Sequence, residues 1–562
     1  MKNGSELRFL IDSVCRKPLL IVFFSYCMMG PGSVQLAYAE GEFCQQSVAG
    51  RTIGDSTILS AILITSGEFS EPNGRKHAAL PAFCRVVAVS RPSLASNILI
   101  EVWLPVSQHW NGKFLATGNG GFAGAIRYDS LAGGLKRGYA VANTDMGTYP
   151  AAAPGIGYAA GNNRPEVVKD WGERATHAMA IFSKQVIKQY YQQPPRFALF
   201  AGCSTGGHQG LTELQRYPND FDGILAGAPG HNRTHLHAMF ADLMLKIRQP
   251  GATMSPPQFQ LWVETMQSRC IGKDGGTASD TFLTDPTQCD ITPQALACQA
   301  GSNAEICLQP GQVKVLDSIY DGTRNSQTGE LIYPPVVYGA EAILASVLTN
   351  HDAHKMPVPD DLHRWVFGPD WDAASFDFAG DMAQVDKALG KYVNALDADA
   401  TAFVAQGGKL IMYHGWADMV VSPLDSIIYF DRLHAKGAGK EDYARLYMAP
   451  GVSHCAGGDG PDMFGQGAAF PVADASRDML LALDQWVENG VAPESVIAVK
   501  YATQTDQTKP PEVRMTRPLC PYPQIALYDG KGDPLSAASF SCQRRPARYE
   551  MPAAQYLGEG VN

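Results

Sequence analysis

The sequence predicts an α/β fold with a parallel-rich central sheet, and three observations support this prediction. Short apolar runs alternate with helical stretches from about residue 98 to residue 229. The alternation stops between about residues 236 and 395, where Pro/Gly-rich turns and amphipathic pieces follow one another. It resumes at GGKLIMYHGWAD and YARLYMAPGVSHC. Because strands that alternate with helices form parallel sheets covered on both faces, we expect one sheet domain with an insertion.

The first part of this core, residues 40–235, presents its elements in order. ILIEVWLP, KFLATG and YAVANTD are apolar runs that end at turn residues, as strands do. Residues 172–191 carry apolar side chains at helical spacing, and Pro194 and Pro195 follow them. RFALFAG predicts a buried strand, GGHQGLTELQRYP a helix that ends before Pro218, and GILAGAP a further strand.

The remaining residues divide into two further parts. We expect residues 236–395 to form an inserted lid domain, because such insertions often cover an active site. Residues 396–562 complete the core. Trp365, Phe367 and Trp371 are candidates for an apolar, aromatic-accepting pocket in the lid, although core positions suit them equally well.

The start of the chain has the pattern of an export signal. Lys and Arg residues precede the apolar run LLIVFFSYCMMG, and Ala37 and Ala39 stand at the spacing of a signal-peptidase site. We expect residues 1–39 to direct export to the periplasm or the medium; a buried N-terminal helix is the alternative. The formal net charge of −10, without Lys/Arg blocks, argues against nucleic acid and anionic lipid as partners. No later apolar stretch is long enough to predict a membrane span in the mature protein.

Cysteine usage agrees with export. An even number of cysteines follows the expected signal, which predicts five disulfides in an oxidising compartment. Local spacing favours the pairs 270–289, 298–307 and 520–542. No CxxC pair occurs, which argues against a zinc ribbon. These cysteines are Cys44, Cys84, Cys203, Cys270, Cys289, Cys298, Cys307, Cys455, Cys520 and Cys542.

Ser204 is the candidate nucleophile. Residues 202–206 fit G-x-S-x-G between a predicted strand and a predicted helix, which is the context of a nucleophile elbow. Such a turn exposes the serine hydroxyl at a helix N-terminus, where developing negative charge is favoured. The alternatives are a tight glycine turn with a solvent-exposed serine, and Cys203 as the nucleophile, although the elbow position belongs to Ser204.

His454 and Asp418 are the candidate base and orienting acid. Each lies in a loop directly after a predicted strand, at the edge where parallel sheets place their sites. The order Ser204, Asp418, His454 is that of α/β-hydrolases. Asp425 and Asp442 are rival acids, but Asp425 lies within a predicted helix and Asp442 precedes a strand.

Both candidate catalytic residues have a cysteine neighbour. Cys203 precedes Ser204 and Cys455 follows His454. If the serine and the histidine meet at hydrogen-bond distance, the two cysteines come close as well. We therefore expect a Cys203–Cys455 disulfide that fixes the distance the chemistry requires.

An oxyanion hole needs two N–H donors. Thr205, the residue after the nucleophile, should supply one, and Gly120 or Gly121 in LATGNGGFAG the other. The same stretch resembles a dinucleotide fingerprint running from Gly118 to Ala123. The helix that such a fingerprint should open is not evident, so we favour the oxyanion hole.

Several histidines remain as candidates for other roles. His231, His235 and His237 cluster at the start of the insertion and suit a metal site or, more simply, a pocket rim or the surface. His414 precedes Asp418 by four residues and suits either substrate binding or a structural hydrogen bond.

From about residue 44 to residue 542 the chain resembles the tannase and feruloyl esterase family. The resemblance rests on Cys203-Ser204, Asp418 and His454-Cys455, together with GNGGFAG, DWGERATHAMAIFSK, GCSTGG, YPNDFDGILAGAP and GGKLIMYHGWAD. It implies a secreted or periplasmic α/β-hydrolase with an inserted lid. The family hydrolyses esters of aromatic acids such as gallate and hydroxycinnamates, and a related group hydrolyses mono(2-hydroxyethyl) terephthalate.

Two segments depart from the family pattern. His208 stands where members usually carry an arginine. Family lids usually hold calcium in an acidic loop, and here the loop reads CIGKDGGTASDTFLTDP. Asp274 and Asp280 remain as candidate ligands, but Ile271 replaces an aspartate and the loop is longer, which should weaken a structural calcium site.

The sequence therefore predicts a secreted serine carboxylic-ester hydrolase that acts on a small aromatic ester, such as a feruloyl or galloyl ester, without a catalytic cofactor. A terephthalate monoester is the alternative substrate. A serine peptidase on the same fold and a catalytically silent binding protein on the same scaffold are the other hypotheses.

Overall fold

A computed structural model of the 562-residue chain describes residues 43–44, 48–148, 164–350, 352, 355, 358–359, 361–436, 442–468, 476–503 and 511–559. The expected export signal, residues 1–39, lies outside the described residues. None of the helices among the described residues has the length and apolar character needed to cross a membrane.

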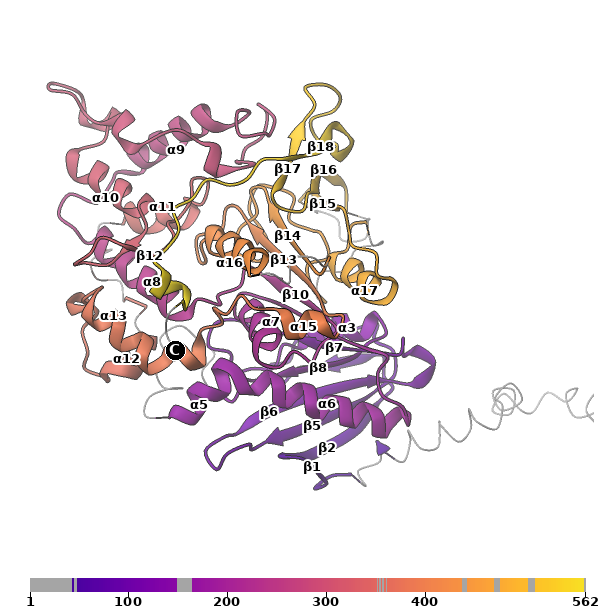
Figure 1. Ribbon diagram of the computed structural model, residues 1–562. Helices are drawn as coiled ribbons and strands as arrows, with labels where there is room; N and C mark the ends of the chain where they lie inside the picture. The colour runs from indigo at the N-terminus through magenta and orange to yellow at the C-terminus, as the bar shows by residue number, and fades with distance from the viewer. Residues whose placement is uncertain are drawn as a thin grey trace, which may run out of the picture.

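A ten-stranded mixed sheet forms the centre of the molecule (Figure 1). Its order is β1 (Thr52–Ile53), β2 (Ser56–Ile64), β5 (Phe83–Ser90), β6 (Ile98–Pro105), β8 (Ala140–Thr144), β7 (Lys113–Thr117), β9 (Phe197–Cys203), β10 (Gly223–Gly227), β13 (Lys409–Gly415) and β14 (Ala444–Ala449). Neighbours pair antiparallel from β1 to β8 and parallel from β8 to β14. The predicted α/β fold with a parallel-rich sheet is confirmed, with an antiparallel N-terminal part.

Helices cover both faces of the sheet. The helices α6 (Ala175–Tyr191), α7 (Thr205–Arg216) and α16 (Pro423–Ala435) pack on one face, and α3 (Tyr128–Lys136) and α17 (Met479–Asn489) on the other. Successive side chains of a strand point to opposite faces, so Phe200 belongs to the first apolar core and Leu199 to the second. This two-sided burial explains why the parallel strands are almost wholly apolar.

The helix expected over residues 172–191 begins earlier and less regularly than its spacing predicts. The short helix α5 (Pro165–Lys169) leads into a π-helical turn, Asp170–Arg174, and then into α6. Gln192 ends α6 in the left-handed conformation, with φ 58°. The two prolines that follow cannot continue a helix.

The segment between β10 and β13, residues 228–408, is largely helical and lies over one end of the sheet (Figure 1). We call it the inserted segment. Its helix α8 runs across the boundary expected at residue 236. Its elements are α8 (Arg233–Ile247), α9 (Pro256–Cys270), α10 (Pro310–Tyr320), β11 (Thr323–Arg324), β12 (Leu331–Tyr333), α11 (Ala342–Leu348), α12 (Asp361–Phe367), α13 (Gly380–Val385), α14 (Lys391–Val393) and α15 (Thr401–Ala405).

Small hairpins complete the fold. β3 (Glu68–Ser70) pairs with β4 (Lys76–Ala78), β15 (Val496–Tyr501) with β16 (Val513–Leu519), and β17 (Gln524–Tyr528) with β18 (Phe540–Arg544). After β18 the C-terminal tail, residues 545–559, crosses the inserted segment (Figure 1). There Ala553 N donates to Leu331 O at 3.1 Å, and Asn325 Nδ2 donates to Tyr556 Oη at 2.7 Å.

Five disulfides connect the cysteines that follow the expected signal. Three of the pairs are those that local spacing favours, and a fourth is the expected pair beside the candidate catalytic residues. The bonds are Cys44–Cys84, Cys203–Cys455, Cys270–Cys289, Cys298–Cys307 and Cys520–Cys542.

Candidate active site

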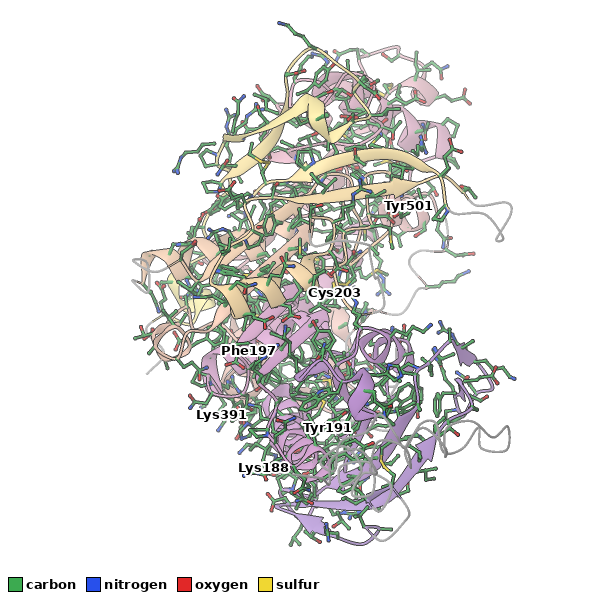
Figure 2. The ribbon with its side chains drawn as sticks, turned by 90° about the vertical axis from the view of Figure 1, so that its right-hand side faces the viewer. Lys188, Tyr191, Phe197, Cys203, Lys391 and Tyr501 are labelled. Atoms are coloured by element: carbon green, nitrogen blue, oxygen red, sulfur yellow. A yellow bond between two sulfur atoms is a disulfide. The ribbon has the colours of Figure 1, made fainter. Side chains whose placement is uncertain are left out.

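Ser204 occupies the sharp turn between β9 and α7. Its φ of 64° and ψ of −119° are values that a non-glycine residue rarely adopts, and they project the side chain at the N-terminus of α7. The glycines around it leave no space for side chains: a Cβ on Gly202 would lie 2.7 Å from Gly206 Cα. Figure 2 shows Cys203 near the middle of the molecule, at the end of β9.

His454 and Asp418 form a hydrogen-bonded pair. His454 Nδ1 lies 2.7 Å from Asp418 Oδ2. The N–H groups of Val420 and Val421 donate to Asp418 Oδ1 at 2.8 and 3.0 Å. Burial alone would raise the pKa of Asp418, but hydrogen bonds from His414 and His454 outweigh it and hold that pKa well below its usual range. Asp418 is therefore a buried carboxylate that stays ionised and orients the imidazole.

His414 lies behind Asp418 and does not line the cavity at Ser204. It is fully buried, with Nε2 3.1 Å from Asp418 Oδ2 and Nδ1 2.8 Å from Ser426 Oγ. Of the two roles considered for His414, this arrangement favours the structural hydrogen bond over substrate binding. Ser426 carries no sequence signal, because nothing in a helical Ser-Ile-Ile pattern indicates that its hydroxyl contacts a histidine.

The rival acids lie elsewhere. Asp425 is buried in α16, where its carboxylate approaches His231 Nδ1 to 3.6 Å and accepts a hydrogen bond from Asn232. Asp442 is exposed and pairs with Arg445.

The three histidines at the start of the inserted segment are all buried, so the expected pocket-rim or surface position is wrong. His231 contacts Asp425, His235 contacts Asn232 and Asp386, and His237 lies beside the Phe122 ring. Their separate partners do not form a shared ligand set.

A cavity brings the candidate serine and histidine together. Ser204 and His454 both line a cavity of about 500 Å³ with residues 118–121, Tyr413 and Gln466. The Cys203–Cys455 disulfide, with a Cα–Cα distance of 5.9 Å, joins the two segments at this point. The volume of the cavity lies in the range of small-molecule binding sites.

The loop after β7 meets the N-terminus of α7 beside Ser204. Thr205 Oγ1 donates to Gly121 O at 2.7 Å, and Gly206 N donates to Asn119 O at 2.8 Å. These contacts hold the expected oxyanion donors, Thr205 N and the glycine pair at 120 and 121, in adjoining segments. The next helix, α3, begins only at Tyr128, so residues 118–123 do not open a helix as a dinucleotide fingerprint does.

Aromatic side chains from three segments meet next to this loop. Phe122 lies 5.2 Å from the ring of Trp171 and 5.2 Å from that of Trp365, measured between centroids. Trp365 of α12 therefore contacts the core. Phe367 and Trp371 instead stack on each other at 5.2 Å within the inserted segment.

The loop considered for calcium does not fit that ion. Asp280 Oδ1 accepts a hydrogen bond from Arg517 Nη2 at 2.5 Å, and its Oδ2 accepts one from Thr277 N at 2.8 Å. The two oxygens of Asp274 accept from the N–H groups of Gly276 and Thr284. A buried guanidinium thus balances the charge of Asp280, and N–H donors occupy the oxygens that calcium would need.

Another acidic group contains His177, Glu213 and Asp220, whose candidate ligand atoms lie within 4.8 Å of one another. His177 Nδ1 lies 2.6 Å from Asp220 Oδ2. Burial, and then the adjacent Asp220, raise the pKa of Glu213 well above its usual value. The raised pKa of Glu213 disfavours the ionised carboxylate that a metal ion would need.

Comparisons with known proteins place the chain in a family. The model of the family "Tannase and feruloyl esterase" matches residues 84–543. An uncharacterized esterase of Xanthomonas campestris pv. campestris is 34% identical over 545 residues, covering 90% of this chain and 92% of that protein. A probable feruloyl esterase B-1 of Aspergillus flavus is 31% identical over 468 residues, covering 82% of this chain and 86% of that protein.

Solved structures agree with these matches. Feruloyl esterase B from Aspergillus oryzae superposes with a TM-score of 0.80 at 28% identity, covering 90% of this chain and all (100%) of that one. Tannin acyl hydrolase from Aspergillus niger shares the fold, with a TM-score of 0.70 at 20% identity over 91% of this chain and 95% of that chain. The chain is therefore a carboxylic ester hydrolase and belongs to the tannase and feruloyl esterase family.

Proposed function

We propose that this protein hydrolyses esters of aromatic carboxylic acids through a Ser204–His454–Asp418 triad. The observation that carries the proposal is the shared cavity. Ser204 and His454 line it together, and His454 Nδ1 is held by the buried Asp418 at 2.7 Å. A serine at an elbow, a histidine oriented by a carboxylate and N–H donors beside the serine are the parts that acyl transfer needs.

The mechanism follows from these positions. His454 Nε2 takes the proton of Ser204 Oγ as this oxygen attacks the ester carbonyl carbon. Asp418 stabilises the resulting imidazolium, and the N–H groups of Thr205 and Gly120 or Gly121 stabilise the oxyanion. The carbon–oxygen bond to the alcohol breaks, and His454 gives its proton to the leaving oxygen. Water then attacks the acyl-enzyme by the same route and releases the acid.

An aromatic cluster adjoins the loop after β7, next to the cavity but outside its lining, and this cluster supports an aromatic acyl group. Phe122, Trp171 and Trp365 gather there, and both the core and the inserted segment contribute to the cluster. We assign the inserted segment the role of a lid over the acyl group. The disulfides and the export pattern of residues 1–39 support an exported enzyme, because such bonds persist in oxidising compartments.

The test is release of aromatic acid by the purified, oxidised protein. Methyl ferulate, methyl gallate and mono(2-hydroxyethyl) terephthalate are compared side by side, with Ser204→Ala as the inactive variant and Ser279→Ala as the matched control. Hydrolysis that is lost only in Ser204→Ala supports the proposal, and the preferred ester identifies the subgroup. A folded protein that hydrolyses none of the esters and fails to react with an arylphosphonate would instead be a silent scaffold.

A further inference from the structure

Arg233 is buried directly behind the nucleophile turn. It is the first residue of α8, and only 6% of its surface is exposed. The turn before Arg233 contacts the nucleophile turn, because Gly230 N donates to Ser204 O at 3.1 Å. A Cβ on Gly230 would lie 3.1 Å from Arg233 Nη2, so the glycine leaves the space that the guanidinium fills.

No carboxylate among the described residues balances this guanidinium. Its central carbon lies 5.1 Å from the centroid of the Trp171 ring, and its Nε is buried without a hydrogen-bond partner. Burial lowers the pKa of Arg233 to about 10, so the side chain remains charged at neutral pH. The charge also lies at the N-terminus of a fifteen-residue helix, where the helix dipole favours anions and not cations.

A charge that is buried, unpaired and at the wrong end of a helix is unfavourable for stability. Such a position is typical of a group retained for function, because active sites tolerate strain that the rest of a protein does not.

Within the described part of the chain the guanidinium of Arg233 has one hydrogen bond, and this bond points to that function. Arg233 Nη2 donates to Thr205 Oγ1 at 3.1 Å, and the same hydroxyl donates to Gly121 O at 2.7 Å. The chain of contacts joins α8, the start of α7 and the loop after β7. The last two are the segments that carry the expected oxyanion donors.

We propose that Arg233 is a positioning and electrostatic residue of the oxyanion hole. Through the Thr205 hydroxyl it holds the two donor segments together, and its unpaired charge stabilises the oxyanion that forms when the ester is attacked. This inference rests on the proposed serine esterase mechanism. The charge of Arg233 stabilises the transition state more than the bound substrate, since the neutral ester gains little from the charge before attack.

The test compares Arg233→Met and Arg233→Lys with the wild-type enzyme. We expect kcat of Arg233→Met to fall about 10- to 100-fold with KM nearly unchanged, which is less than the loss of an oxyanion-hole donor causes because Arg233 acts through Thr205. Arg233→Lys should recover part of the loss, because it keeps the charge without the planar fork. Thr205→Val should show the same loss of kcat and Thr205→Ser should not. Arg51→Met, on the exposed surface, is the matched control.

Two readouts separate this role from a structural one. The melting temperature of Arg233→Met should be unchanged or higher, because an unpaired buried charge has been removed. An arylboronic acid, which forms an anionic tetrahedral adduct on Ser204, should bind the variant more weakly, while a neutral amide analogue of the ester binds equally well. An active wild-type enzyme whose Arg233→Met variant keeps kcat, or loses kcat together with its melting temperature, would overturn the inference. A wild-type enzyme without esterase activity would refute the proposed function itself.

Discussion

Cys203 and Cys455 are bonded to each other across 252 residues of sequence, so that the residue before Ser204 is fixed to the residue after His454. In the proposed mechanism, the bond therefore constrains the distance between Ser204 and His454 on which proton transfer depends. Cys203 is the last residue of β9, and Cys455 adopts the left-handed conformation with a φ of 67°. The disulfide thus joins the end of β9 to the loop that carries His454.

Removing this bond should affect chemistry and stability together. We expect the double variant Cys203→Ala/Cys455→Ala to lose about 10-fold or more in kcat, since a small misplacement of a base is costly. Its free energy of unfolding should fall by about 2–4 kcal/mol. Initial rates and urea unfolding measure the two effects. Cys298→Ala/Cys307→Ala, which opens a loop with a separation of only 9 residues, should keep kcat; equal losses in both double variants would contradict the prediction.

His414 should act on catalysis through Asp418. Replacing it in His414→Phe removes one of the two histidine hydrogen bonds that depress the pKa of Asp418. That pKa should rise, so Asp418 should take up a proton at a higher pH than in the wild type; kcat should fall about 10-fold with KM unchanged, and fall further at acid pH. Ser426→Ala should shift the pH profile of kcat in the same direction by a smaller amount. His434→Phe, on the same helix as Ser426 but away from Asp418, is the control, and an unmoved profile in His414→Phe would rule out this role.

The buried pair of Asp280 and Arg517 should stabilise the protein without calcium. Both side chains are 1% exposed. Asp280→Ala should cost about 3–5 kcal/mol of unfolding free energy, because it leaves a buried charge unpaired. Adding Arg517→Met to this variant should restore most of the lost unfolding free energy. Urea unfolding measures these values, and EDTA should leave the wild-type transition in place; a lower transition with chelator, recovered by added calcium, would show that the loop does hold the ion.

Glu341 should make stability depend on pH. Burial raises its pKa to about 6, from 4.5, against opposing hydrogen bonds from Tyr320 and Gly339. The folded state therefore holds a proton that the unfolded state releases between about pH 4.5 and 6. This contribution to stability is complete below about pH 4.5 and is lost as the pH rises through 6. The melting temperature of Glu341→Gln, relative to that of the wild type, should thus be higher at pH 7 than at pH 4.5. Thermal unfolding at both pH values measures this difference. The same difference at both pH values would contradict this assignment.

The parallel part of the fold could be predicted because each of its strands is a continuous apolar run followed by a turn. The predicted strands at ILIEVWLP, KFLATG and RFALFAG correspond to β6, β7 and β9. The apolar runs predict no strand before residue 98, although β1 to β5 lie there. In β2 the register shifts between Ile58 and Ser60, and Leu59 and Ile62 are exposed, so neither face shows a clean alternation.

Some residues of the candidate site can likewise be identified from the sequence, and others cannot. Ser204, Asp418 and His454 follow strands and carry local patterns, which sequence alone can recognise. Arg233, Ser426 and Arg517 carry no such pattern, because their importance comes from partners far away in the chain. Arg517 meets Asp280 across 237 residues, and no spacing rule connects two single residues over that distance.

The C-terminal tail has a practical consequence for work with this enzyme. It runs from the last hairpin over the inserted segment to β12 and back to the core, where Arg432 Nη2 donates to Leu557 O at 2.6 Å. A dye, tag or solid support attached near Ala553 would pull directly on the segment that we assign as the lid. Attachment at the exposed positions of strand β2, such as Leu59, which lie away from the inserted segment, would leave that segment free to move during turnover (Figure 1).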